Sequence, residues 1–172
     1  MQPDYHQGNP LATLKSCKGF YECPKDDDGI RLGPLVGYAG KYKTGAGEKQ
    51  WVGEIYANFA KAEEYPWIIR NFTSEIDPKL TPYMESVDCL CGAPIGGYAF
   101  AQSLGADYHC PVIKAEKKVT LAGSDTQREE SKLVFGRHSI EPGGNYAIVE
   151  DVCNNFSTTE QLIELILQES GG

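Results

Sequence analysis

Two adjacent acids and a polar loop separate an apolar segment from a helix-like segment near the end of the chain. Glu150 and Asp151 directly follow the apolar run, and Ser157 opens the helix-like stretch. This order predicts carboxylates and unpaired backbone N–H groups at the same edge of a sheet. The N–H groups and the helix dipole attract phosphate, and the hydroxyls of Ser157, Thr158 and Thr159 add donors. The pattern indicates a site for a phosphorylated polyol; a plain crossover whose acids face water is the alternative.

A glycine-rich turn in the middle of the chain follows a second apolar run, at residues 87–91. Its residues are Gly92, Ala93, Pro94, Ile95, Gly96 and Gly97. Glycines there allow main-chain donors to face a pyrophosphate, and the helix expected from Tyr98 to Leu104 offers its N-terminus to the same group. A glycine-rich turn alone is weak evidence, so its position between a strand and a helix carries the prediction.

The segment from Tyr146 to Thr159 resembles the motif that binds phosphoribosyl pyrophosphate (PRPP) in type I phosphoribosyltransferases. In that family an apolar strand runs into two acids, which Glu150 and Asp151 match, and then into a loop that usually reads Thr-Thr-Gly-Gly-Ser/Thr-Thr. The aligned loop residues here are Asn154, Asn155, Phe156, Ser157, Thr158 and Thr159. The resemblance implies that this loop binds the 5′-phosphate. Both family glycines are replaced, and a positive φ is tolerated by Asn but not readily adopted by Phe.

The glycine-rich turn resembles the pyrophosphate loop of the same family, which often reads Gly-x-Pro-x-Gly-Gly before a helix with alanine. The run 112–118 is similar to the strand exit Arg-Lys-Glu-x-Lys of orotate phosphoribosyltransferases, with Lys114 and Lys118 at basic positions and Ala115 where a lysine is usual. By this resemblance Lys117 joins them in contacting pyrophosphate, and a loop from about Thr120 to His138 closes over the site. A solvated lysine-rich face is the alternative.

The resemblance implies a magnesium-dependent transferase that joins a nucleobase, with orotate favoured, to PRPP and releases pyrophosphate. It implies Glu150, Asp151, Lys114 and Lys118 as the catalytic residues. Mg²⁺ would arrive with the donor, so no side chain is assigned as a direct metal ligand, and a homodimer is expected. Two alternatives stay open: a non-catalytic protein that binds PRPP or a nucleotide for regulation, and a purine or xanthine salvage enzyme of the same fold.

The elements that must position these residues alternate between strand and helix in the second half of the chain. We expect strands over 87–91, 109–113 and 146–149 and helices from Tyr98 and from Ser157, which is typical of an α/β fold with a mainly parallel central sheet flanked by helices. Ser157 and Glu160 predict a capping box. Gly105 and Gly171 are expected to end the two helices.

The first part of the chain is less regular. Residues 1–80 are expected to form an N-terminal hood and residues 81–172 the PRPP-binding core of one domain, 1–172. Apolar spacing predicts a helix over 52–69 that Pro66 stops or kinks. The polar stretch from Lys114 to Glu141 is expected to be a mobile loop or hairpin.

Composition argues against two classes of binding partner. The chain has 172 residues, 41% of them hydrophobic, and a net charge of -8, which argues against nucleic acid and anionic membranes as partners. No run reaches the ~18 to 20 apolar residues that span a bilayer, and no signal peptide is evident, so a soluble cytoplasmic protein is expected. The six cysteines show no CxxC spacing, so free thiols are favoured, with Cys89 and Cys91 in a buried strand.

Overall fold

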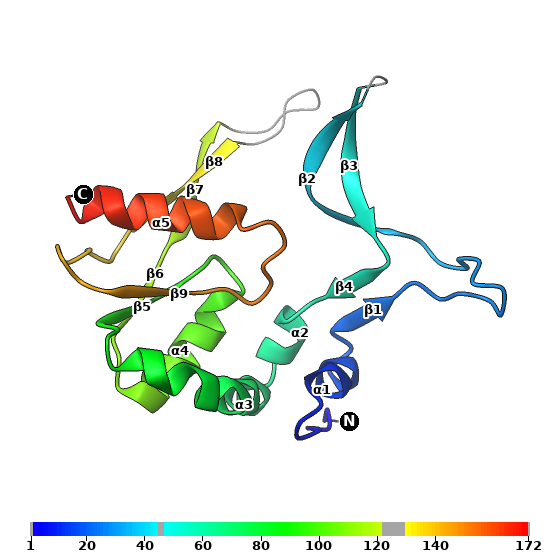
Figure 1. The fold of residues 1–172 in the computed structure, drawn as a ribbon, viewed down its shortest axis with the longest axis horizontal. Helices are drawn as coiled ribbons and strands as arrows, with labels where there is room; N and C mark the ends of the chain where they lie inside the picture. Colours follow the sequence, from blue (N-terminus) through cyan, green and yellow to red (C-terminus); the bar gives the residue numbers. More distant parts are fainter. Residues whose placement is uncertain (1, 45–46, 122–129, 172) are drawn as a thin grey trace. The chain divides into compact units, whose positions relative to one another are not determined.

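The computed structural model describes residues 2–44, 47–121 and 130–171, and it divides the chain into two compact units, Met1–Ile68 and Ile69–Gly172 (Figure 1). The division falls inside the first long helix, earlier than the boundary near residue 80 expected from the sequence. That the units act as one domain stays a prediction.

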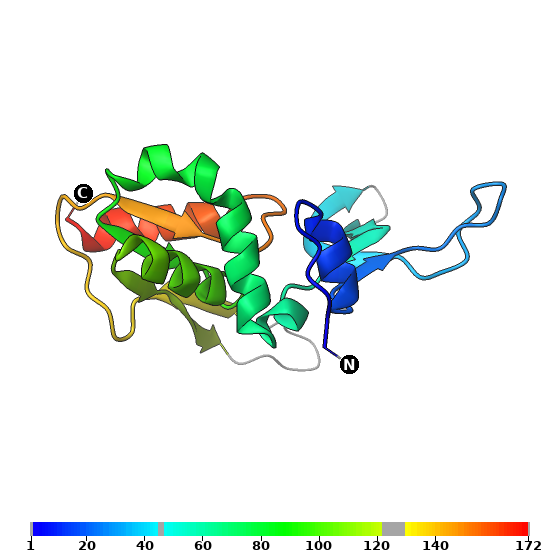
Figure 2. The same ribbon diagram turned by 90° about the horizontal axis from the view of Figure 1, so that it is seen from below.

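The second unit is built on a parallel sheet in the order β6-β5-β9. Residue Leu90 of the central strand pairs with Val112 on one side and with Ala147 on the other. Figures 1 and 2 show α5 on one face of this sheet and α4 on the other. The expected α/β fold with a parallel sheet flanked by helices is confirmed. Its strands are β5 (Cys89–Gly92), β6 (Val112–Lys114) and β9 (Tyr146–Val149), and its helices α3 (Pro66–Met84), α4 (Gly97–Tyr108) and α5 (Ser157–Glu169).

The core of this unit forms where β5 meets α5. Side chains alternate across a strand, so Cys89 and Cys91 point to the same face, and both cluster with the fully buried Leu162 and with Ile166 of α5. Burial, with a smaller contribution from the nearby Cys89, raises the pKa of the Cys91 thiol to about 12. Cys91 therefore stays protonated at neutral pH and packs as a small apolar group, as predicted for a free thiol in a buried strand.

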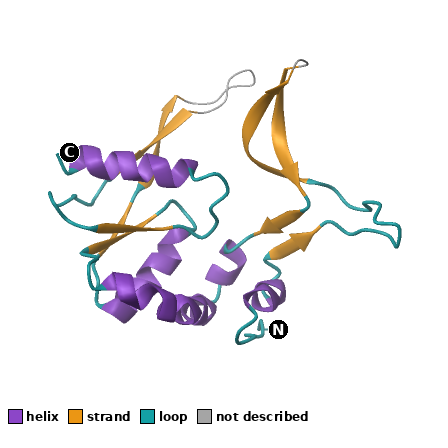
Figure 3. Ribbon diagram, viewed as in Figure 1, coloured by secondary structure: helices purple, strands orange, loops and turns teal. Residues whose placement is uncertain are grey.

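An antiparallel hairpin follows the sheet strand β6. It consists of β7 (Glu116–Leu121) and β8 (Glu130–Val134), visible in Figure 3. The hairpin expected between Lys114 and Glu141 is thus confirmed for its two strands. Residues 122–129, which fall in the expected closing loop, lie outside the described residues.

The first unit contains two small antiparallel pairs. β1 pairs with β4, and β2 forms a hairpin with β3. The helix predicted over 52–69 was wrong for its first half, because Ile55, Tyr56 and Ala57 pair with the strand at 20–22, whereas residues 60–63 and 66–69 are helical. Pro66 begins a helix instead of stopping one, as proline does without cost at a first helical position. The elements are α1 (Pro10–Ser16), β1 (Phe20–Glu22), β2 (Val36–Thr44), β3 (Gly47–Gly53), β4 (Ile55–Ala57) and α2 (Ala60–Glu63).

Two helix ends test the glycine predictions. Gly171 has a φ of +87° immediately after the C-cap of α5, as expected. Gly105 does not end α4; the helix continues to Tyr108, and His109 takes the left-handed C-cap conformation with a φ of 54°. Gly105 instead allows close packing, because a Cβ there would overlap the Val112 side chain of β6. Among the described residues, no helix is long and apolar enough to span a membrane.

The burial of α5 gives a direct test of this packing. Leu162 is 0% exposed and Leu167, on the same helix, is 54% exposed. We expect Leu162→Ala to lower the free energy of unfolding by about 2 to 5 kcal/mol, because it leaves a cavity in the core. Leu167→Ala is the matched control and should change it by less than about 1 kcal/mol. Urea unfolding followed by circular dichroism measures both, and equal losses would contradict the packing of α5.

Candidate functional site

The carboxyl ends of two neighbouring strands bring the glycine-rich turn and the two acids to one edge of the sheet. Gly92 pairs with Val149 at the ends of β5 and β9, so the turn and the acids leave the sheet side by side. The backbone N–H of Ala93 donates to the Val149 carbonyl at 2.9 Å. Parallel strands predict this meeting, and in α/β sheets the crevice at such an edge is where ligands bind.

The turn and the acids are in close contact. A Cβ added to Gly96 would overlap the carboxylate of Asp151, and one added to Gly97 would overlap the carbonyl oxygen of Val149. The Pro94–Ile95 peptide is cis, and the Ile95 side chain is 75% exposed. Glycine at 97 is therefore required by space, because a side chain there would meet main chain, whereas a side chain at 96 would have to displace the Asp151 carboxylate.

Glu150, the other acid, is hydrogen-bonded to the first turn of α5. The Thr159 hydroxyl donates a hydrogen bond of 2.6 Å to Oε2 of Glu150. Both side chains are partly buried. The bond fixes one carboxylate oxygen of Glu150 and leaves the other to accept from a ligand hydroxyl. Glu150, Asp151 and Thr159 are thus brought together, as the sequence predicted for one sheet edge.

The residues before α5 form a cap that differs from the predicted capping box. Phe156 is the N-cap residue, with a φ of 59° and no capping bond from its side chain. Ser157 is the first helical residue, so its hydroxyl cannot cap the helix as expected. Instead Oδ1 of Asn155 accepts from the Ser157 N–H at 3.3 Å and from its hydroxyl at 2.9 Å. The capping-box prediction was wrong, because Phe156 and not Ser157 is the N-cap residue of α5.

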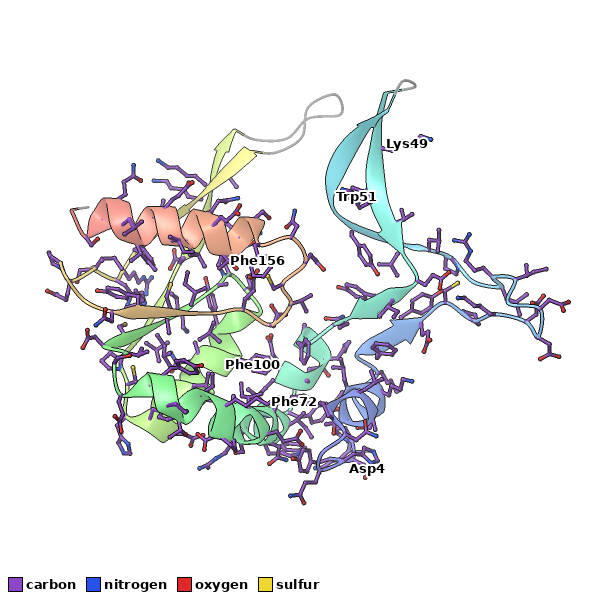
Figure 4. The ribbon with its side chains drawn as sticks, viewed as in Figure 1. Asp4, Lys49, Trp51, Phe72, Phe100 and Phe156 are labelled. Carbon is purple, nitrogen blue, oxygen red and sulfur yellow. The ribbon has the colours of Figure 1, made fainter. Side chains whose placement is uncertain are left out.

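Phe156 is the most unusual residue of this loop. Its side chain is 64% exposed, and Figure 4 shows it at the start of α5. A left-handed backbone at a non-glycine residue lowers the stability of the fold by about 1 to 2 kcal/mol, because the Cβ crowds the following carbonyl. The loop therefore keeps a conformation that suits glycine at a position where the sequence has Phe.

The three predicted lysines lie in different surroundings. Lys114 is the last residue of β6 and pairs with Gly92, next to the glycine-rich turn. Its Nζ lies 5.2 Å from the centroid of the Tyr98 ring. Lys117 and Lys118 lie on β7 with exposed side chains, and as neighbours on a strand they point to opposite faces. Within the described ranges, no hydrogen bond or ion pair joins either of them to the turn.

Sequence reasoning missed Tyr98. Its hydroxyl donates to the carbonyl of Ala115, directly after Lys114. Burial, with a smaller effect of the nearby Glu116, raises the pKa of the Tyr98 phenol, so the proton remains available to donate. An aromatic residue immediately after the last glycine was the only local signal, and its partners on the next strand are not local in sequence.

A separate cavity of about 300 Å³ lies between α3 and α4, toward the end of α4 that is remote from the turn. Its polar groups already have partners: Arg70 pairs with Asp107 at 3.3 Å, and the Thr73 and Ser103 hydroxyls are 2.8 Å apart. We interpret this hollow as part of the helix packing. It is lined by Arg70, Thr73, Ser74, Asp77, Leu104 and Asp107.

No protein-family model matches the chain, and no curated protein matches it in sequence. Solved structures do. Adenine phosphoribosyltransferase from Saccharomyces cerevisiae superposes with a TM-score of 0.55 and 16% identity, over 76% of this chain and 77% of that one. The Rhodothermus marinus adenine phosphoribosyltransferase gives a TM-score of 0.51 and 17% identity over 94% and 80%. The chain thus has the phosphoribosyltransferase fold.

UMP synthase from Leishmania donovani is also similar, with a TM-score of 0.48 and 18% identity over 76% of this chain. The chain spans only 25% of the length of that protein.

The different neighbours of Gly96 and Gly97 predict different effects of an added side chain on stability. We expect Gly96→Ala to keep the fold but displace the Asp151 carboxylate, because a flexible side chain can move aside. Gly97→Ala should lower the free energy of unfolding by more than about 2 kcal/mol, since its Cβ meets a backbone carbonyl. Thermal unfolding compares the two variants. Equal stability of both would mean that the turn does not lie against β9 as described.

The backbone at position 156 gives a second test. We expect Phe156→Gly to be more stable than Phe156→Ala by about 1 kcal/mol, because only glycine adopts the left-handed region without loss. Both variants remove the same exposed ring, so each is the control for the other. Urea unfolding measures the difference. An alanine variant as stable as the glycine variant would show that residue 156 is not left-handed.

Proposed function

We propose that this protein transfers the 5-phosphoribosyl group of PRPP to a nucleobase and releases pyrophosphate. The observation that carries the proposal is the contact between the turn 92–97 and Asp151. It joins, at one sheet edge, a loop suited to pyrophosphate and an acidic pair suited to ribose hydroxyls. The fold shared with phosphoribosyltransferases supports the same proposal.

In this proposal the acids and the start of α5 hold the ribose 5-phosphate half of the donor. Glu150 and Asp151 accept hydrogen bonds from the ribose hydroxyls. The loop residues Asn154, Asn155 and Phe156 and the hydroxyls of residues 157–159 surround the 5′-phosphate. Asn155 already accepts from the Ser157 N–H and hydroxyl, so a phosphate oxygen at these donors must replace the Asn155 oxygen.

The pyrophosphate half is assigned to the residues of the glycine-rich turn, from Gly92 to Gly97, together with the lysines. Lys114 is the cation whose position next to Gly92 supports this role. Lys117 and Lys118 are proposed to join it when donor is bound. The turn also precedes the N-terminus of α4, which favours negative charge.

The reaction that these groups support needs positioning and charge stabilisation rather than a covalent intermediate. The bond from ribose C1 to the pyrophosphate oxygen breaks as C1 gains oxocarbenium character, a nitrogen of the base forms the new bond to C1, and the proton of that nitrogen leaves with the departing pyrophosphate. Lys114 stabilises the negative charge that develops on pyrophosphate, while the carboxylates of residues 150 and 151 keep the ribose in place.

A magnesium ion bound with the donor would neutralise phosphate charge. Glu150 and Asp151 offer the oxygen ligands that Mg²⁺ prefers. Among the described residues, no group of three or more His, Cys, Asp or Glu side chains could hold a metal. The donor set therefore fits an ion shared between the protein and the substrate phosphates, which is the usual way proteins bind Mg²⁺ in phosphate sites.

We propose orotate as the base, because the lysine pattern at 114–118 resembles that of the orotate enzymes. Adenine is the second candidate, supported by the fold shared with two adenine phosphoribosyltransferases. The residues that contact the base are proposed to come from the first unit, acting as a hood, and the active form is proposed to be a homodimer.

A non-catalytic binding protein is a second candidate function, and Phe156 is the observation that favours it. Its exposed ring stands at the start of α5, where the family's loop has glycine and the backbone approaches phosphate. In this case the protein would bind PRPP or a nucleotide through the same edge and release no pyrophosphate.

The test is incubation with PRPP, Mg²⁺ and each of orotate, uracil, adenine, guanine, hypoxanthine and xanthine, with pyrophosphate and nucleotide both measured. We expect turnover with orotate, and loss of at least about a hundredfold in kcat in the double variant Glu150→Gln, Asp151→Asn. Asp27→Asn, Asp28→Asn is the matched control, since it neutralises an exposed pair of adjacent acids in the first unit.

The outcomes of this experiment distinguish the candidate substrates and the two candidate functions. Turnover with adenine alone would show that adenine, and not orotate, is the substrate. Full activity in the Glu150, Asp151 double variant, with unchanged thermal unfolding, would exclude the acidic pair as the ribose clamp. Tight PRPP or nucleotide binding with no pyrophosphate release from any base would favour the binding protein and reject the transferase.

A further inference from the structure

Tyr98 lies where three parts of the proposed site meet. It is the second residue of α4, directly after the glycine-rich turn. Its ring packs against the end of β5, since a Cβ on Gly92 would lie 3.1 Å from the Tyr98 Cδ1 atom. The side chain is half-buried and therefore held by its neighbours.

The hydroxyl of Tyr98 connects α4 to the chain that leaves β6. It donates to the carbonyl of Ala115, a residue that is 0% exposed. The N–H of the same Ala115 donates to the Gly92 carbonyl at 3.4 Å. Ala115 is thus bonded on both sides, to the ring of α4 and to the end of β5, and this fixes the backbone next to Lys114.

The ring of Tyr98 also contacts the lysine itself. Nζ of Lys114 lies 5.2 Å from the ring centroid, within the range of a cation–π contact. A lysine side chain has four rotatable bonds and loses much entropy when it is ordered. A ring beneath the ammonium group reduces the number of positions that the group occupies before any ligand binds.

We propose that Tyr98 is the positioning residue for Lys114, holding its ammonium group beside the turn 92–97 so that it meets pyrophosphate without rearrangement. The hydroxyl fixes the backbone after Lys114, and the ring face fixes the side chain. This inference rests on the proposed function for its consequence in binding, but the contact itself can be measured without any ligand.

The same helix provides a matched control. Tyr108, at the other end of α4, donates its hydroxyl to Asp77 of α3. Tyr108→Phe therefore removes a tyrosine hydroxyl bond from the same helix without touching Lys114. Tyr98→Phe removes the bond to Ala115 but keeps a ring under the ammonium group, and Tyr98→Leu removes both.

The first measurement is the NMR shift of the Lys114 ε-methylene protons, assigned with Lys114→Arg. A ring face shifts protons above it upfield. We expect the upfield shift in the unmodified protein, in Tyr98→Phe and in Tyr108→Phe, and its loss in Tyr98→Leu. A Lys114 signal at the ordinary position in the unmodified protein would overturn the proposal.

The second measurement is calorimetric titration with pyrophosphate in the presence of Mg²⁺ and, separately, with ribose 5-phosphate. We expect Tyr98→Leu to weaken pyrophosphate binding by about three- to tenfold, the range of a cation–π contact, with ribose 5-phosphate affinity unchanged. Tyr98→Phe should lose less, and Tyr108→Phe nothing. A merely structural role would weaken both ligands together.

The results separate this inference from the proposed function. Unchanged pyrophosphate affinity in Tyr98→Leu, where Lys114→Ala weakens it, would overturn the positioning role alone. An equal loss for both ligands in Tyr98→Leu would also overturn it. If the unmodified protein binds neither ligand, the proposed function fails, and the role of Tyr98 in binding fails with it even where the NMR contact is present.

Discussion

The parallel pairing of β5 with β9 is the constraint on which the candidate site depends. The register that sets Gly92 opposite Val149 places the turn over the acids, and the bond from Ala93 to Val149 extends the ladder into the turn itself. Because side chains alternate along a strand, a slip of one residue would turn Cys89 and Cys91 away from α5 and break the core. The same hydrophobic packing that stabilises the sheet thus fixes the position of the site.

The loop before α5 combines two requirements that conflict. A phosphate site needs free N–H groups at a helix start, whereas a stable helix needs those groups capped. Asn155 meets the second requirement by accepting from Ser157, and Phe156 keeps the left-handed turn that brings Asn155 into place. The N–H and the hydroxyl of Ser157 can therefore donate either to Asn155, which stabilises the helix start, or to a bound phosphate.

Much of the second unit could be predicted from the sequence, because its signals are local. The strand at 146–149 and the helix from Ser157 have the predicted bounds, and the meeting of the turn with the acids follows from parallel strands ending at one edge. The helix predicted over 52–69 failed in its first half because Ile55 and Tyr56 pair with a strand at 20–22 that no spacing rule reveals. Gly105 was misjudged and Tyr98 was missed for the same reason: their roles depend on Val112 and Ala115, which are distant in sequence.

The close approach of the turn to β9 also bears on how this sequence can diverge. Glycine can be required by backbone angle or by lack of space, and the two requirements differ in strength. The first can be broken for about 1 to 2 kcal/mol, which a chain can recover elsewhere, and Phe156 is such a case. The strength of the second depends on what fills the space: a side chain at 96 has only to displace the Asp151 carboxylate, whereas one at 97 meets main chain. A substitution at 96 therefore acts on the position of Asp151, whereas a substitution at 97 acts on the backbone of β9.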